Sequence, residues 1–193
     1  MTKKLSALHI SLIIVGVLIL DQVTKYITKT YMELGQSIHI IGNFFRLTYV
    51  ENPGMAFGLR IENNFVFLLL SLIAAALVFY YLYKLRNESW PLQLAISLIA
   101  SGAIGNLSDR FIRGSVVDFF DFEFFDISIP AFKLLGFDFS GYYMTRWPVF
   151  NIADMAVSCG MIIIFAFILL KGDPLRETSK ESSESPESAS HAG

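Results

Sequence analysis

Cysteine, histidine and charge are scarce in this chain of 193 residues. The single cysteine, Cys159, excludes an intramolecular disulfide framework and any zinc or iron–sulfur site built from several cysteines. The three histidines lie far apart and leave little material for a histidine metal site. Charged residues form 17% of the chain, against about 25% in soluble domains. The net charge of −2 excludes the basic surface of a nucleic-acid-binding protein, so no nucleic acid partner is expected.

Hydrophobic residues, in contrast, form 54% of the chain and lie in long unbroken runs. A helix needs about 20 residues to cross a bilayer. Four segments are long and apolar enough, and the predicted spans are residues 5–27, 65–83, 91–113 and 150–170. No small-residue cleavage site follows the first run, which therefore predicts a retained span rather than a signal peptide. The expected fold is an all-α membrane protein with four transmembrane helices.

Basic residues near the ends of the spans predict the orientation in the membrane. With four spans, the following basic residues fall on one side: Lys3, Lys4, Lys84, Arg86, Lys171 and Arg176. Both termini should therefore be cytoplasmic, and the long loops at about 28–64 and 114–149 should face outward. Residues 171–193 are rich in Ser, Glu, Lys and Pro, which predicts a disordered cytoplasmic tail after a single integral membrane domain over 1–170.

The two outer loops carry different patterns. Residues 38–50 are rich in β-branched and aromatic residues with partial alternation, which predicts one or two short strands and hence a small periplasmic β-subdomain. Residues 119–147 are crowded with aromatic side chains. Such a loop either lies in the membrane interface as an aromatic belt or forms a small β-lid packed on itself, and the sequence leaves both open.

Two aspartates are the best candidates for chemistry. Asp118 lies just beyond the third predicted span, and Asp154 lies four residues into the fourth, about 6 Å from its outer end. Both belong to one membrane level, where an ionisable residue suggests a function. Two adjacent carboxylates share a proton, so one can activate water while the other polarises a peptide carbonyl. The residues alone are equally compatible with a helix cap and an ion-pair partner.

Polar neighbours accompany both aspartates. Asn106, Asp109 and Arg110 share one helical face, and Arg113 continues it. An arginine here serves either as a counter-ion for Asp109 or to hold a phosphate or lipid ester. Gly102 and Gly105 on the same helix permit close helix approach. Asn151, three residues before Asp154, is placed to orient a carboxylate or to donate to a substrate carbonyl.

Two further motifs lie at the outer side. Asn52 and Gly54 belong to Glu51-Asn52-Pro53-Gly54, which taken alone predicts a turn. Asp21 and Lys25 are four residues apart at the end of the first span, where an exposed pair would add only about 0.5 kcal/mol. A positioning role is therefore the better interpretation of this pair.

Five motifs, taken together, resemble the signal peptidase II family, also called lipoprotein signal peptidase. They are Asp21-Gln22-x-x-Lys25, Asn52-Pro53-Gly54-Met55-Ala56-Phe57-Gly58, Gly105-Asn106-x-x-Asp109-Arg110, Gly114-x-Val116-x-Asp118-Phe119 and Phe150-Asn151-x-Ala153-Asp154. The resemblance covers roughly residues 5–170. It implies an aspartyl endopeptidase that removes signal peptides from diacylglyceryl-modified prolipoproteins by cleaving before the lipidated cysteine.

The resemblance also assigns roles to residues. Asp118 and Asp154 match the catalytic pair of the family. The positions that match contacts to the substrate or to the antibiotic globomycin are Asn52, Asn106, Arg110 and Asn151, and the supporting positions are Asp21, Lys25, Gly54 and Asp109. The implied setting is the bacterial inner membrane, in contact with phospholipid, with the site near the periplasmic face. We expect a monomer without metal or cofactor, because two-aspartate hydrolysis requires none.

One departure from the family pattern stands between the two aspartates. The stretch between Asp118 and the Phe150-Asn151 motif is longer than the family usually shows. Residues from about Asp121 to Arg146 therefore look like an inserted, aromatic-rich lobe. The hypothesis for this lobe is that it rests on the outer leaflet and guides the lipid-anchored substrate.

The alternative function is a proton-coupled membrane transporter, because paired intramembrane aspartates also relay protons. Both acids lie near one surface, however, whereas transport sites cluster at the midplane. A zinc peptidase is excluded because the chain has no His-Glu-x-x-His motif.

Overall fold

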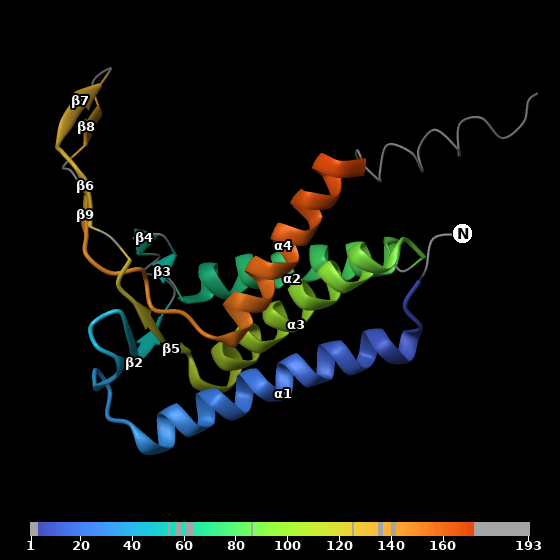
Figure 1. The fold of residues 1–193 in the computed structure, drawn as a ribbon, viewed down its shortest axis with the longest axis horizontal. Helices are drawn as coiled ribbons and strands as arrows, with labels where there is room; N and C mark the ends of the chain where they lie inside the picture. The colour runs from blue at the N-terminus through green and yellow to red at the C-terminus, as the bar shows by residue number, and fades with distance from the viewer. Residues whose placement is uncertain are drawn as a thin grey trace, which may run out of the picture.

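Four long helices, a three-stranded sheet and three short strand pairs make up the part of the chain that the structure describes. This computed structural model describes residues 4–53, 55–56, 59–60, 64–85, 87–124, 126–134, 137–139 and 142–171. The helices are α1 (Ala7–Tyr31), α2 (Asn64–Lys84), α3 (Trp90–Arg113) and α4 (Ile152–Lys171). Helix α3 lies between the other three and contacts each of them (Figure 1). Predicted tail residues 172–193 lie outside the described part.

Three helices of the described residues are long and apolar enough to cross a membrane: Ala7–Tyr31, Trp90–Arg113 and Ile152–Leu170. They confirm three of the predicted spans as candidates. Helix α2, with 21 residues, covers the whole of the predicted span 65–83. The first residues of α1 and the last residues of α4 lie at the same end of the bundle, opposite the sheet (Figure 1).

Small residues allow α3 and α4 to pack closely. A Cβ atom added at Gly102 would lie 2.3 Å from the Ala153 carbonyl oxygen, and one at Gly160 would lie 2.6 Å from the Ala95 carbonyl oxygen. A Cβ at Gly105 would lie 2.6 Å from Asp21 Oδ2, so α1 also approaches α3 closely. These contacts confirm the close helix approach predicted from Gly102 and Gly105, and they bring polar side chains of three helices together.

A three-stranded antiparallel sheet lies beyond one end of the helices. Its strands, in spatial order, are β1 (Ser37–Ile41), β2 (Phe45–Asn52) and β5 (Val116–Phe122). The strands predicted within 38–50 are therefore confirmed. Helix α3 ends at Arg113 and is capped by Gly114, which adopts the left-handed conformation with φ of 78°; β5 begins two residues after Gly114. In the register of β2 and β5, Val50 faces Asp118 and Asn52 faces Val116.

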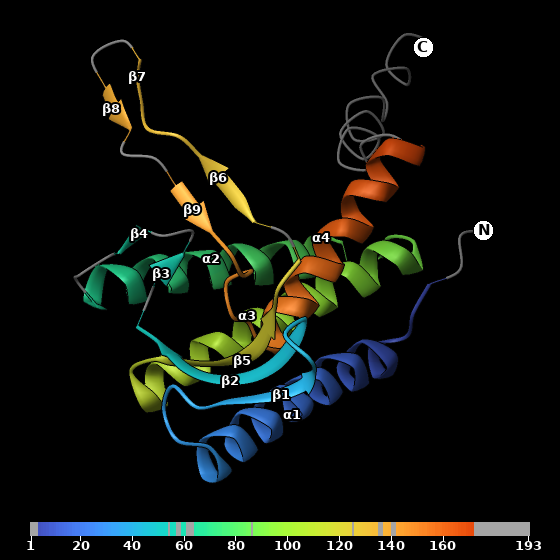
Figure 2. The same cartoon turned by 60° about the vertical axis from the view of Figure 1, so that its left-hand side comes forward.

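The aromatic-rich loop forms an antiparallel arm that projects from the sheet (Figures 1 and 2). Strand β6 (Ile127–Ile129) pairs with β9 (Tyr142–Met144), and β7 (Phe132–Leu134) pairs with β8 (Phe137–Phe139). A further short pair joins β3 (Met55–Ala56) and β4 (Leu59–Arg60). The loop is thus β structure, as the lid alternative expects, but it extends away from the bundle. We name β6 to β9 the arm.

Candidate active site

A backbone bridge places Asp118 beside the start of α4. The amides of Phe119 and Phe120 both donate to the Phe150 carbonyl oxygen, at 3.1 and 2.8 Å, and the Phe150 amide donates back to Phe120 at 3.1 Å. Phe150 precedes Asn151, the residue just before α4. The loop that leaves β5 therefore comes back to β5 at Phe150. This pairing brings Asp118 close to the segment Asn151 to Asp154.

Asn151 and Asp154 cap α4 reciprocally. The Asp154 amide donates to Asn151 Oδ1 at 3.0 Å, and the Asn151 amide donates to Asp154 Oδ2 at 3.2 Å. This is a capping box, which satisfies two amides that the helix leaves without partners. The helix dipole also favours negative charge at this end. The cap that the sequence left open as an alternative is present, and it fixes the half-buried Asp154 carboxylate in place.

Three asparagine amides connect the two carboxylates. Asn151 Nδ2 donates to Asp118 Oδ1 at 2.6 Å, and Asn52 Nδ2 donates to Asp118 Oδ2 at 3.3 Å. Asn106 Nδ2 donates to Asp154 Oδ1 at 2.7 Å, and Asn151 Nδ2 also approaches Asn106 Oδ1 at 3.1 Å. Three predicted binding positions thus surround the predicted catalytic pair, although they come from β2, α3 and the start of α4.

Asp118 is buried, with 3% of its surface exposed. Burial, and next the negative charge of Asp154, raise the pKa of the Asp118 carboxyl from 3.8 to about 7. The hydrogen bonds from Asn52 and Asn151 oppose this shift because they stabilise the ionised form. The Asp118 carboxyl therefore keeps a proton far more readily than an ordinary aspartate, as one member of a proton-sharing pair must.

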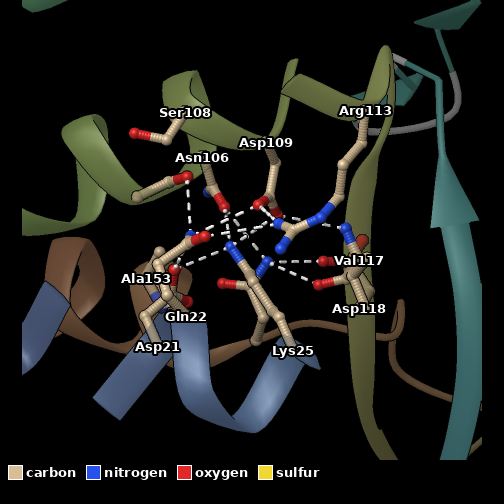
Figure 3. Close-up of polar contacts among 12 residues, drawn as sticks. Asp21, Gln22, Lys25, Asn106, Ser108, Asp109, Arg113, Val117, Asp118 and Ala153 are labelled. Carbon is tan, nitrogen blue, oxygen red and sulfur yellow. Dashed lines mark hydrogen bonds and ion pairs between the residues drawn. The ribbon is translucent and has the colours of Figure 1, made fainter. Parts of the chain in front are cut away.

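A buried lysine, Lys25, lies among acidic and amide side chains of α1 and α3 (Figure 3). Lys25 is fully buried and forms ion pairs with Asp21 Oδ2 and Asp109 Oδ2, both at 2.9 Å. Its Nζ also donates to Asn106 Oδ1 at 2.9 Å. Since the amide oxygen of Asn106 faces the lysine, its NH₂ group faces Asp154. We name Asp21, Lys25 and Asp109 the charge cluster.

The charge cluster also binds the backbone beside each carboxylate. Asp21 Oδ1 accepts from the Ala153 amide at 2.9 Å, next to Asp154. Asp109 Oδ2 accepts from the Val117 amide at 3.3 Å, next to Asp118. These contacts are consistent with the positioning role expected for Asp21 and Lys25. The ion pair between the two side chains is buried, not exposed as the sequence-based estimate assumed.

Three residues near the site, Gln22, Arg113 and Glu51, lie in segments that the sequence analysis named but were not among the assigned site residues. Gln22 Nε2 donates to Asp21 Oδ2 at 3.0 Å and to Asp109 Oδ1 at 3.2 Å. Arg113 pairs with Asp109, so the counter-ions of Asp109 are Arg113 and Lys25. Arg110 instead donates from Nη1 to the Asn106 carbonyl oxygen at 3.2 Å. The Asp-Gln pair and the i,i+4 spacing of Asp109 and Arg113 were the available signals for the first two.

Glu51 is the third of these residues. It accepts from Lys29 at 2.7 Å, from the Tyr49 hydroxyl at 2.6 Å and from Ser115 at 3.1 Å. These donors, first Lys29 and then Tyr49, lower the pKa of the Glu51 carboxyl. These contacts join β2 to α1 and to the turn before β5. They therefore fix the end of β2, where Asn52 lies. The acidic residue in the Glu51-Asn52-Pro53-Gly54 motif was the signal, and Gly54 itself lies outside the described residues.

A model of the family described as signal peptidase (SPase) II matches residues 13–170 of this chain. The chain belongs to the signal peptidase II family. A signal peptidase II is a peptidase and a multi-pass membrane protein, and the transporter alternative is not supported. Among the described residues, no group of three or more His, Cys, Asp or Glu side chains could hold a metal ion.

Relatives of this signal peptidase II match it over most of its length. The chain is 36% identical over 165 residues to "Lipoprotein signal peptidase" of Moorella thermoacetica, covering 86% of this chain and 93% of the relative. It is 38% identical over 159 residues to "Lipoprotein signal peptidase" of Staphylococcus aureus (strain Newman), covering 82% of this chain and 86% of the relative.

Two solved structures described as a bacterial membrane enzyme also resemble the fold. The structure at 2.3 Å resolution has a TM-score of 0.66 and 33% identity, and the match covers 97% of both chains. The structure at 1.9 Å resolution has a TM-score of 0.66 and 35% identity, covering 90% of this chain and 99% of the other. The membrane enzyme architecture is therefore shared along nearly the whole chain.

Proposed function

We propose that this peptidase is an aspartyl endopeptidase that removes signal peptides from diacylglyceryl-modified prolipoproteins and cleaves before the lipidated cysteine. Asp118 and Asp154 are the catalytic residues in this proposal. The observation that carries it is the pair of carboxylates joined through Asn151, which donates to Asp118 from its side chain and to Asp154 from its backbone. No cofactor is needed for this chemistry.

The two carboxylates divide the work according to their surroundings. Asp154, half-buried and held by amides, acts as the base that takes a proton from the attacking water. Asp118, whose raised pKa favours its protonated form, donates to the peptide carbonyl oxygen as the water oxygen adds to the carbonyl carbon. When the tetrahedral intermediate collapses, the C–N bond breaks and Asp154 returns its proton to the leaving amine. At the same time Asp118 takes a proton back from a hydroxyl of the gem-diol, which leaves a carboxylic acid product and restores both aspartates.

The remaining polar residues bind and orient the substrate in this proposal. Asn52 and Asn151 hold Asp118, and Asn106 holds Asp154. Arg110 is anchored beside Asn106, where its positive charge suits an ester of the lipidated cysteine or the inhibitor globomycin. Gly54 belongs to the same proposed set by its motif alone.

The proposed setting is the bacterial inner membrane, with residues 1–170 as one integral domain. Helix α2 is the fourth span, both termini are cytoplasmic, and the sheet with the carboxylate pair faces the periplasm. The common location of the α1 start and the α4 end, opposite the sheet, supports this orientation (Figure 1). The enzyme works as a monomer in contact with phospholipid.

A cleavage assay with purified enzyme and a diacylglyceryl-modified signal peptide tests the function. Asp118→Asn and Asp154→Asn should each lower kcat by about 10²–10⁴-fold, because each removes one proton-transfer group. Asp126→Asn is the matched control, since Asp126 is an exposed aspartate outside the site and its variant should cleave normally. Full cleavage by either site variant would refute the assignment to this pair.

A further inference from the structure

An apolar pocket lies next to the carboxylate pair. Its volume is about 420 Å³, and it is lined by Phe120, Phe122, Phe124, Trp147, Phe150 and Met155. This volume falls within the usual range for small-molecule sites, about 300–1,000 Å³. Trp147, Phe124 and Met155 are each about half exposed, so the pocket is open to a ligand. We name these six residues the aromatic pocket.

The aromatic pocket is continuous with the site. Side chains on a strand alternate between faces, so Phe120 and Phe122 share the face of β5 that carries Asp118. On α4, Met155 follows Asp154 directly. Phe150, which precedes the capping residue Asn151, bonds through its backbone to Phe120. Two walls of the pocket therefore come from the elements that also carry the two carboxylates, β5 and α4.

The rings form a preorganised wall. Phe122 stacks on Phe150 and on Phe124, with ring centroids 5.8 and 5.6 Å apart, and Phe120 contacts Phe150 at 5.7 Å. The strand rises about 13 Å from Asp118 to Phe122, and the Phe124 ring continues beyond it. This length exceeds that of a single extended amino-acid side chain, so one side chain of a peptide could not cover the whole wall.

The side chains that line the pocket are apolar, which favours an apolar ligand. A peptide backbone laid along these rings would lose its hydrogen bonds to water without replacement, which costs free energy. An acyl chain has no polar group to satisfy, and its length suits a wall of stacked rings. We infer that the aromatic pocket binds one acyl chain of the substrate's diacylglyceryl group and so holds the lipidated cysteine beside Asp118 and Asp154. The inference rests on the proposed function and adds the subsite that recognises the lipid.

The first test measures kcat/KM for two diacylglyceryl peptides, one with hexadecanoyl and one with butanoyl chains. Met155→Trp narrows the pocket and should reduce the preference for long chains over short chains by about tenfold, the loss expected when about two methylenes of the chain no longer fit in the pocket. Met161→Trp is the matched control: Met161 lies exposed on the same helix, outside the pocket, and its variant should keep the preference of the unmodified enzyme. An unchanged preference in Met155→Trp would overturn the inference.

The second test locates the chain directly. A substrate with a diazirine at the end of one acyl chain is bound to the full-length Asp154→Asn variant, irradiated, and the labelled peptides are identified by mass spectrometry. Label on Phe122, Phe124 or Trp147 supports the inference. Label confined to the outer surfaces of the helices overturns it, as does label from a diazirine phospholipid that the substrate fails to displace.

The two proposals fail in different ways. An unmodified enzyme that cleaves neither peptide defeats the proposed function. An enzyme that cleaves both, with a chain-length preference that Met155→Trp leaves unchanged, defeats only the acyl-chain subsite. Melting temperatures of both tryptophan variants without substrate confirm that the comparison concerns folded protein.

Discussion

Asp21 Oδ1 accepts a hydrogen bond from the Ala153 amide at 2.9 Å, although 132 residues separate them. A carboxylate of the first helix thus caps the last helix, at the residue before Asp154. The partner of Asp21 in the charge cluster, Asp109, accepts from the Val117 amide, at the residue before Asp118. Lys25 joins Asp21 to Asp109, so one buried cation links the backbone positions of both carboxylates.

We expect Lys25→Met to unfold the protein more easily, because it leaves two buried carboxylates without their shared cation. Breaking a buried ion pair in this way costs about 3–5 kcal/mol, measured by denaturant unfolding in detergent. The control is Lys29→Met. Lys29 is paired with Glu51 but 46% exposed, so its loss should cost about 1 kcal/mol or less. Equal losses in the two variants would contradict a structural role for the charge cluster.

The pH dependence of cleavage should report the protonation of Asp118. Because the acid form of Asp118 is the active form, kcat/KM should fall as the pH rises through about 7. Asn52→Ala removes a hydrogen bond that lowers this pKa, so the alkaline limb of the profile should move to higher pH. Wild-type and variant pH profiles check this, and an alkaline limb that stays in place would contradict the assignment of the proton to Asp118.

Close packing of α3 against α4 should be necessary for both stability and activity. We expect Gly102→Ala to cost about 1–3 kcal/mol, because its Cβ would lie 2.3 Å from the Ala153 carbonyl oxygen. The displacement acts next to Asp154, so cleavage should weaken as well. Gly16→Ala is the control in α1, where nothing lies within 4 Å of the added Cβ. Thermal unfolding and cleavage assays check both, and a Gly102→Ala variant as stable and active as Gly16→Ala would refute the packing argument.

The arm is expected to act on lipid-anchored substrates. Its base is tied to the sheet by Arg146, which donates to Asp121 Oδ1 at 2.6 Å and to the Asn43 carbonyl oxygen at 2.9 Å. Replacing Ile127–Met144 by a short Gly-Ser link leaves this attachment in place. Cleavage of a lipidated peptide should then fall more than cleavage of its unlipidated counterpart. Equal loss for both peptides, or no loss, would count against lipid guiding.

Hydrophobic runs alone located the helices to within a few residues, because burial of apolar side chains in lipid is a local property of a segment. The predicted span 91–113 corresponds to α3 at Trp90–Arg113, and 150–170 corresponds to α4 at Ile152–Lys171. The first span was extended only to 27, whereas α1 continues to Tyr31. Its last turns contain polar residues such as Lys25 and Thr28, which are buried against protein rather than exposed to lipid. Apolar runs alone therefore do not mark where this helix ends.

Strand β5 was harder to foresee than the strands of 38–50. Its sequence, Val116–Phe122, is buried along most of its length, and its partners come from β2 and from Phe150. A strand whose pairing is entirely with distant segments has no local turn to mark it. For the same reason, Glu51 and Gln22 gained their importance only when α1, β2 and α3 came together.

The sequence by itself determined the apolar spans, the two aspartates at one membrane level, and the amides and arginines available beside them. Only the tertiary structure decided which groups pair: Lys25 with both Asp21 and Asp109, Arg113 rather than Arg110 with Asp109, and Asn151 between Asp118 and Asp154. The reason is physical. Helix formation follows from neighbouring residues, whereas these contacts depend on how close glycines let three helices approach and on how each helix is rotated toward the others.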